Sequence, residues 1–146
     1  MSWPTPKTVV VPLDFSDESE RAFKTAIDVA GDASSVRAVH VLFPLDAVSP
    51  GVAWGEITDE SREQAVRQEF DKLQQRLGQS GVPFDVRVGN PGLEITDFAS
   101  EINADLIVVA SHGYHGFKRM VLGSVAERVI RHAACDVLVL RRTDAD

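Results

Sequence analysis

The sequence predicts an α/β fold: a doubly wound, five-stranded parallel sheet with helices on both faces, formed by residues 1–146 as one domain. Two observations predict it. Short apolar segments alternate with amphipathic helical segments in the order βαβαβαβαβ, and crossovers of this length join parallel strands. The strand segments are apolar without alternation, which is typical of strands buried on both faces. A length of 146 residues suits a single domain.

The first half of the chain begins with a strand, a helix and a second strand. Residues 7–13 form a β-branched run typical of a buried strand. Residues 17–30 place apolar side chains on one helical stripe, and residues 36–43 form the second strand. Residues 44–57 contain proline and glycine and show no period, so we expect a long, mobile loop there.

A second helix follows this loop. Ser61 and Gln64 have the spacing of a capping box, and the helical stripe after them ends at residues 78–81, which begin and end with glycine. Residues 82–88 then form the third strand.

The remaining elements alternate in the same way. Asn90 as the N-cap and Pro91 as the first helical residue predict the start of the next helix. Residues 105–110 are a strongly apolar strand, a helix is expected over residues 124–133, and residues 136–140 form the last strand. In such sheets ligands bind beyond the carboxyl ends of the strands, where the strand order reverses, so the turns after strands one and four are the candidate site.

The composition excludes several function classes. Fifteen basic and 22 acidic residues give a net charge of −7, which argues against nucleic-acid or membrane-surface binding. No apolar run reaches the ~20 residues of a membrane span and no leader is recognised, so we expect a cytoplasmic protein. The single cysteine, Cys135, cannot form an internal disulfide. Residues 103–142 carry a net positive charge, which reflects either an ordinary uneven distribution of surface charge or a site for a small anion.

A glycine-bearing loop follows the fourth strand and leads into the last helix. It contains Gly113, Gly116 and Gly123, with Ser124 directly after them. Glycine lets backbone N–H groups approach an anion closely, and the first amides of a helix attract phosphate. The alternative is a flexible connection in which Ser124 and Glu127 form a capping box.

This loop resembles the phosphate motif Gly-x2-Gly-x9-Gly-Ser/Thr of the universal stress protein family. Gly113 is followed, after nine residues, by Gly123 and Ser124. The resemblance covers nearly the whole chain. The other segments that resemble the family are residues 11–16, His40-Val41, residues 89–91 and residues 125–130.

The resemblance implies a site for ATP and Mg²⁺. Pro12 and Val41 would bracket the adenine, and Asp14 would hydrogen-bond the ribose or help to hold the Mg²⁺ ion. The alternative for Asp14 is a turn-forming Asx cap before the first helix. The residues that the resemblance assigns to nucleotide binding are Pro12, Leu13, Asp14, Val41, Ala110, His112, Gly113, Gly116, Gly123, Ser124 and Val125.

One position departs from the family motif, because its first glycine is replaced by Ala110. Alanine fits an extended backbone but is strained where φ must be positive. The family divides into ATP-binding members and members that lack the motif. Since the other two glycines, the serine and Asp14 are retained, the chain resembles the ATP-binding members.

The implied function is that of a stress-response regulator. It would bind ATP at the carboxyl ends of strands one, two and four and act through an unidentified protein partner. Slow ATP hydrolysis is the most we expect, because no nucleophile with a placed base is recognised. The alternative is a homodimeric stress-response interaction module that does not bind nucleotide. A third reading, a small-molecule enzyme, rests on analogy of fold alone.

The last strand predicts how the chain associates. We expect it to lie at the edge of the sheet, where an apolar strand with unpaired backbone groups favours pairing with another strand. A twofold-related copy would satisfy that edge, and the resemblance also implies a homodimer. The residues expected in this interface are Val137, Leu138, Val139 and Leu140.

Overall fold

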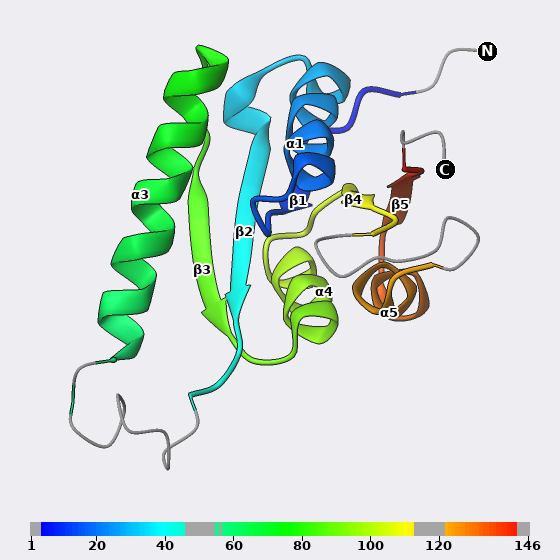
Figure 1. The fold of residues 1–146 in the computed structure, drawn as a ribbon. Helices are drawn as coiled ribbons and strands as arrows, with labels where there is room; N and C mark the ends of the chain where they lie inside the picture. Colours follow the sequence, from blue (N-terminus) through cyan, green and yellow to red (C-terminus); the bar gives the residue numbers. More distant parts are fainter. Residues whose placement is uncertain (1–3, 46–54, 56, 113–121, 143–146) are drawn as a thin grey trace.

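The computed structural model describes residues 4–45, 55, 57–112 and 122–142 and contains the predicted five-stranded parallel sheet (Figure 1). The strands are β1 (Val9–Pro12), β2 (Val36–Leu42), β3 (Phe84–Val88), β4 (Leu106–Ala110) and β5 (Asp136–Leu140). Their order across the sheet is β3-β2-β1-β4-β5, and every pairing is parallel. The central strand β1 has β2 on one side and β4 on the other, so the strand order reverses between β1 and β4.

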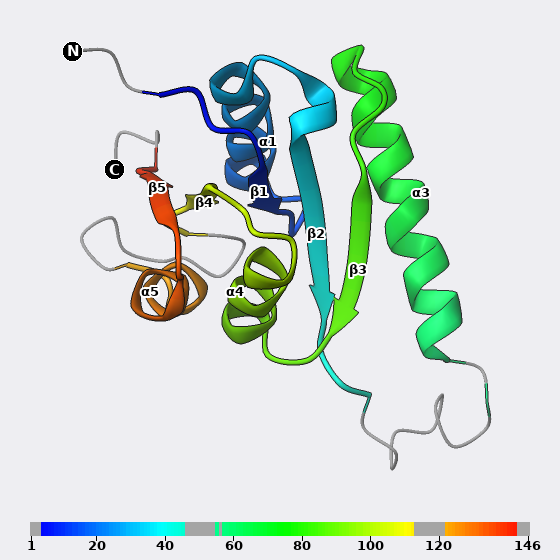
Figure 2. The same ribbon diagram turned by 180° about the vertical axis from the view of Figure 1, so that it is seen from behind.

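The helices form two layers, one on each face of this sheet (Figures 1 and 2). They are α1 (Asp17–Ala30), α3 (Asp59–Leu77), α4 (Pro91–Glu101) and α5 (Ser124–His132), and a short 3₁₀ turn, η1 (Ala33–Ser35), precedes β2. Helices α1 and α3 pack on one face, and α4 and α5 pack on the other. The doubly wound α/β architecture predicted from the sequence is therefore confirmed.

Each face of the sheet has its own apolar core. Along β1, Val9 and Val11 face α1 while Val10 faces α4 and α5, and all three are fully buried. This explains why the strand reads as a continuous apolar run, since both of its faces are covered. On the α1 side, Phe23 meets Phe70 edge to face, with ring centroids 5.8 Å apart.

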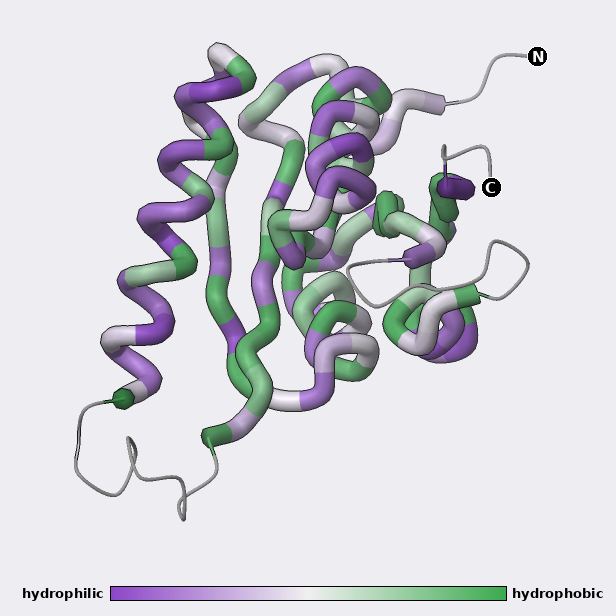
Figure 3. Tube along the Cα trace, viewed as in Figure 1, coloured by the Kyte–Doolittle hydropathy of each residue, from purple (hydrophilic) through white to green (hydrophobic). Residues whose placement is uncertain are grey.

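Most residues of helix α3 are hydrophilic, with a few hydrophobic positions among them (Figure 3). Of its 19 residues, Phe70 and Leu73 are the buried ones. Phe70 also stacks on Phe84 of β3, with ring centroids 4.2 Å apart. One aromatic stack therefore anchors a long helix to an edge strand.

The helix starts confirm one capping prediction and correct another. The Asn90 side chain accepts a hydrogen bond from the Leu93 amide, as the N-cap of α4. The capping box of α3 instead joins Thr58 to Ser61, each side chain accepting from the other's amide at 3.0 Å. The predicted pair of Ser61 and Gln64 was wrong because the helix begins three residues earlier, with two acidic residues in its first turn.

Most of the loop predicted over residues 44–57 lies outside the described residues, so the expectation that it is mobile stays a prediction. In the described part of the chain, no helix is long and apolar enough to cross a membrane.

Candidate functional site

The turn after β1 is built around Asp14, which is exposed at the carboxyl edge of the sheet. Its Oδ1 accepts hydrogen bonds from the amide and the hydroxyl of Ser16, the N-cap of α1. The Asx turn considered as an alternative is therefore present. The other oxygen, Oδ2, makes no hydrogen bond to the described residues. Asp14 thus shapes the turn and still has one carboxylate oxygen to offer a ligand.

Leu13 has a structural role in the same turn. Its side chain is 3% exposed and belongs to the core beneath α1. Its amide donates to the Val39 carbonyl at 2.8 Å, and its carbonyl accepts a hydrogen bond from Nδ1 of His40. Leu13 and Asp14 are the two predicted nucleotide-binding residues that follow Pro12, and of these two Asp14 is exposed.

The end of β4 brings Ala110 and His112 to the same edge. Ala110 pairs with Leu140 in an extended strand and is not among the described residues with positive φ. Replacement of the motif's first glycine therefore causes no backbone strain here. His112 is 5% exposed, and its Nδ1 lies 3.2 Å from Oγ of Ser111. Its Nε2 is buried and has no hydrogen-bond partner among the residues that the structure describes.

Helix α5 begins directly against this strand end. Gly123 is its N-cap and has no side chain with which to cap the first turn. The Gly123 amide donates to the Ser111 carbonyl at 2.8 Å, and a Cβ at Gly123 would lie 2.7 Å from that oxygen. Since its φ is −65°, glycine is required here for close approach and not for a left-handed backbone.

Ser124 is the first residue of α5, so the capping box of Ser124 and Glu127, considered as the alternative, is not formed. Ser124 is exposed and Val125 is half-buried. The first amides of a helix have no partner within the helix, and they carry the positive end of its dipole. The start of α5 can therefore accept an anionic group.

The strand order brings the predicted residues to one edge of the sheet. Pro12 ends β1, Val41 lies near the end of β2, and β4 ends at Ala110 on the other side of β1. Gly113 and Gly116 lie outside the described residues. Sequence reasoning did not assign His40 or Ser111 to the site, because their contacts involve backbone or neighbouring groups that no motif specifies.

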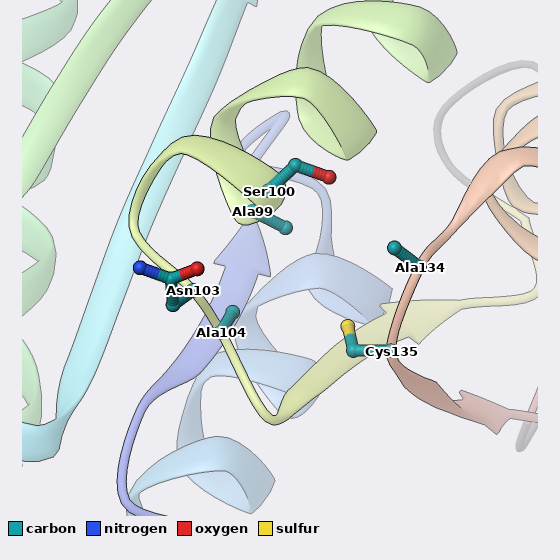
Figure 4. Close-up of a pocket in the computed structure, with 6 residues that line it drawn as sticks. All are labelled: Ala99, Ser100, Asn103, Ala104, Ala134 and Cys135. Atoms are coloured by element: carbon teal, nitrogen blue, oxygen red, sulfur yellow. The ribbon is translucent and has the colours of Figure 1, made fainter.

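A pocket of about 340 Å³ lies near the amino ends of β4 and β5, opposite the carboxyl ends of the strands (Figure 4). It is formed by the segments that precede β4 and β5, whereas the candidate site follows the strands. Burial, followed by the charges of Asp136 and Asp105, raises the pKa of the Cys135 thiol in this pocket, so the thiol is a weak nucleophile. Its lining residues are Ala99, Ser100, Asn103, Ala104, Ala134 and Cys135.

Two further features of the described residues bear on the site. They contain no group of three or more His, Cys, Asp or Glu side chains that could hold a metal ion. In addition, β5 is an edge strand of the sheet, and Leu138 on it is 36% exposed. The predicted position of the last strand is confirmed, whereas its pairing with a second copy stays a prediction.

Comparison with known proteins agrees with this architecture. The sequence model of the universal stress protein family matches residues 5–141. A universal stress protein of Methanocaldococcus jannaschii is 36% identical over 144 residues, which cover 93% of this chain and 82% of the relative.

Two solved structures that resemble the chain hold nucleotides. A universal stress protein in complex with cAMP is 28% identical, with a TM-score of 0.64, and the match covers 94% of this chain and 98% of that one. The universal stress protein from Archaeoglobus fulgidus in complex with dAMP is 25% identical, with a TM-score of 0.60, and the match covers 94% of this chain and 100% of that one. From the family match, the curated relative and the shared fold, we conclude that the chain belongs to the universal stress protein family.

Proposed function

We propose that this protein is a stress-response regulator that binds an adenine nucleotide, ATP in particular, at the carboxyl ends of β1, β2 and β4. The observation that carries the proposal is made at His112. Its backbone lies against the start of α5, and its buried Nε2 has no hydrogen-bond partner among the described residues. A buried polar atom without a partner is unfavourable by about 1–3 kcal/mol, so a ligand that supplies the partner is favoured. The relatives solved with cAMP and dAMP support an adenine nucleotide as that ligand.

The site divides into two halves along the strand order. The adenosine half lies at β1 and β2, where Pro12 and Val41 would bracket the base and Asp14 would face the ribose. The phosphate half lies at β4 and α5, where Ser124 and the Val125 amide would bind phosphate oxygens. The proposed nucleotide-binding residues also include His112, Gly113, Gly116 and Gly123.

A divalent ion would be held mainly by the phosphates. Mg²⁺ binds through one or two carboxylates together with substrate phosphates, and Asp14 Oδ2 is the proposed protein ligand. In the described residues, two serine hydroxyls lie beside a potential base, Ser16 at Asp14 Oδ1 and Ser111 at His112 Nδ1. Both serines are buried, at 5% and 7% exposed, so neither is presented to a ligand as a nucleophile. We therefore propose binding as the function, with slow ATP hydrolysis at most, and action in the cytoplasm through a protein partner.

An observation also favours the second candidate, an interaction module without nucleotide. Asp14 Oδ1 is already occupied by Ser16, so the turn is stable without a ligand. Under this alternative the exposed edge of β5 would be the functional surface.

Replacing Ser124 by alanine tests the proposed site. We expect Ser124→Ala to weaken ATP binding by about 1–3 kcal/mol, because one hydrogen bond to a charged phosphate is lost. Since Gly123 caps α5, the free energy of unfolding should change by less than about 0.5 kcal/mol. Calorimetry and urea unfolding measure the two quantities. Ala110→Gly is the control and should leave affinity unchanged, because Ala110 is already extended. Absence of heat with ATP, ADP and AMP in the wild type would remove the nucleotide proposal.

The proposed homodimer is tested at β5. Leu138→Lys should shift the protein towards monomer, because a charge on an edge strand opposes pairing. Leu93→Lys is the matched control, since Leu93 is 38% exposed on α4, and it should leave the association state unchanged. Sedimentation at micromolar concentration reads out both variants. A monomeric wild type would rule out the dimer.

A further inference from the structure

The turn after β1 holds an unfavourable backbone conformation. Phe15 has φ 64°, and Asn103 is the other described non-glycine residue with positive φ. Asparagine tolerates this region, whereas a bulky residue such as phenylalanine rarely adopts it. Such conformations persist where the surrounding structure holds them, and they concentrate at functional sites. The contacts of Phe15 with the surrounding residues are therefore evidence on the role of this turn.

His40 of β2 contacts the turn on both sides of Asp14. Its Nδ1 is hydrogen-bonded to the Leu13 carbonyl, 27 residues away in sequence. Because a carbonyl oxygen can only accept, Nδ1 carries the proton and donates it. The ring centroid of His40 lies 5.4 Å from that of Phe15, with the planes inclined by 38°. One imidazole thus contacts the residue before Asp14 and the residue after it.

The Asp14 backbone and side chain are held within the same turn. Its amide lies 3.3 Å from the Ser19 hydroxyl, and its Oδ1 accepts from Ser16. These bonds set the shape of the turn. Two links join the turn to β2, the strand that carries Val41: the Leu13 amide donates to the Val39 carbonyl, and the His40 side chain contacts Leu13 and Phe15. Of these two links, that of His40 is the side-chain one, so the placement of Asp14 relative to Val41 depends in part on His40.

We propose that His40 is a positioning residue for the adenosine half of the nucleotide site. It fixes the β1 turn, and with it Pro12 and Asp14, relative to Val41, without touching the ligand itself. This inference rests on the proposed nucleotide function. The strand order β2-β1-β4 places β1 between His40 and the phosphate half at α5, so His40 acts on adenosine and not on phosphate.

Two substitutions separate positioning from simple packing. His40→Leu removes the donor, whereas His40→Asn retains an N–H group attached to Cγ, at the place of Nδ1. Adenosine and AMP are the probes, and calorimetry is performed well below each variant's melting temperature. His40→Leu should weaken both ligands by the same factor, about three- to tenfold, as expected for one lost hydrogen bond. His40→Asn keeps the hydrogen bond but not the ring that meets Phe15, so it should bind both ligands more tightly than His40→Leu and less tightly than the wild type.

Ser124→Ala is the matched control for the other half of the site. It should weaken AMP and leave adenosine unchanged, because adenosine has no phosphate. If His40→Leu lowers the melting temperature without changing either affinity, its role is packing and the inference is overturned. The inference is also overturned if His40→Leu weakens AMP but not adenosine.

Phe15→Gly provides a second variant should His40→Leu fail to fold. Glycine adopts φ near 64° without strain but removes the ring that meets His40. Weaker binding of adenosine and AMP by one common factor supports the inference, and unchanged binding of both overturns it. A wild-type protein that binds neither adenosine nor AMP would overturn the proposed function, and this inference with it. That outcome is distinct from a wild type that binds both and a His40→Leu variant that binds equally well.

Discussion

Replacing Gly123 by valine is expected to abolish nucleotide binding. A Cβ at this position would lie 2.7 Å from the backbone carbonyl oxygen of Ser111, which cannot move without disturbing the end of β4. The start of α5 must therefore shift, and Ser124 and the Val125 amide shift with it. We expect AMP binding to fall by at least about a hundredfold, because more than one charge-assisted hydrogen bond is lost.

The same clash should lower the free energy of unfolding by about 1–3 kcal/mol, as overpacking does elsewhere. A control must therefore separate lost stability from lost binding. Gly78 has φ 64° in open space at the end of α3, so Gly78→Ala should destabilise by about 1 kcal/mol through strain alone. Binding that survives in Gly78→Ala and disappears in Gly123→Val assigns the loss to the site. Full-strength AMP binding in a folded Gly123→Val protein would contradict the placement of phosphate at α5.

Replacing Phe23 by alanine is expected to cause the largest loss of stability. Phe23 is fully buried between α1 and the sheet and meets Phe70 edge to face. Removal of a buried phenyl ring typically lowers the free energy of unfolding by about 3–5 kcal/mol, since a cavity remains. For a chain of this length the melting temperature should fall by roughly 10 °C.

Phe43 offers a matched control for this substitution. Its side chain is 67% exposed just after β2, so Phe43→Ala should change stability by less than about 0.5 kcal/mol. Urea unfolding followed by circular dichroism measures both variants. Equal effects of the two substitutions would show that the α1-side core does not depend on Phe23.

Much of the fold could be predicted because its signals are local. The stripe of α1 repeats within 14 residues, and the predicted bounds of that helix match the structure. Asn90 followed by Pro91 indicates a helix start through the chemistry of two adjacent residues. The capping box of α3 was misplaced because Thr58 and Ser61 are both able to cap, and the sequence alone does not rank them.

The candidate site was predicted in part. The turns after β1 and β4 were identified from strand order, and the pairing of β1 with β4 confirms that they are neighbours. The reason given for Gly123 was incomplete, since the glycine is needed by the protein's own backbone at Ser111. The contact between His40 and Leu13 could not be predicted, because no periodicity reports which side chain meets a strand end.

By itself the sequence determined the order of the elements and the apolar face of each helix, and it predicted the strand-end turns at which we propose that a ligand binds. These follow from the period of apolar residues and from the parallel connections, which need only neighbouring residues to be recognised. The tertiary structure alone decided that His40 contacts Leu13 in the β1 turn and that α5 starts against Ser111. It also decided that Nε2 of His112 is buried without a partner among the described residues. Each of these contacts depends on the distance between two packed segments. That distance is fixed by the volumes of the side chains across the whole core.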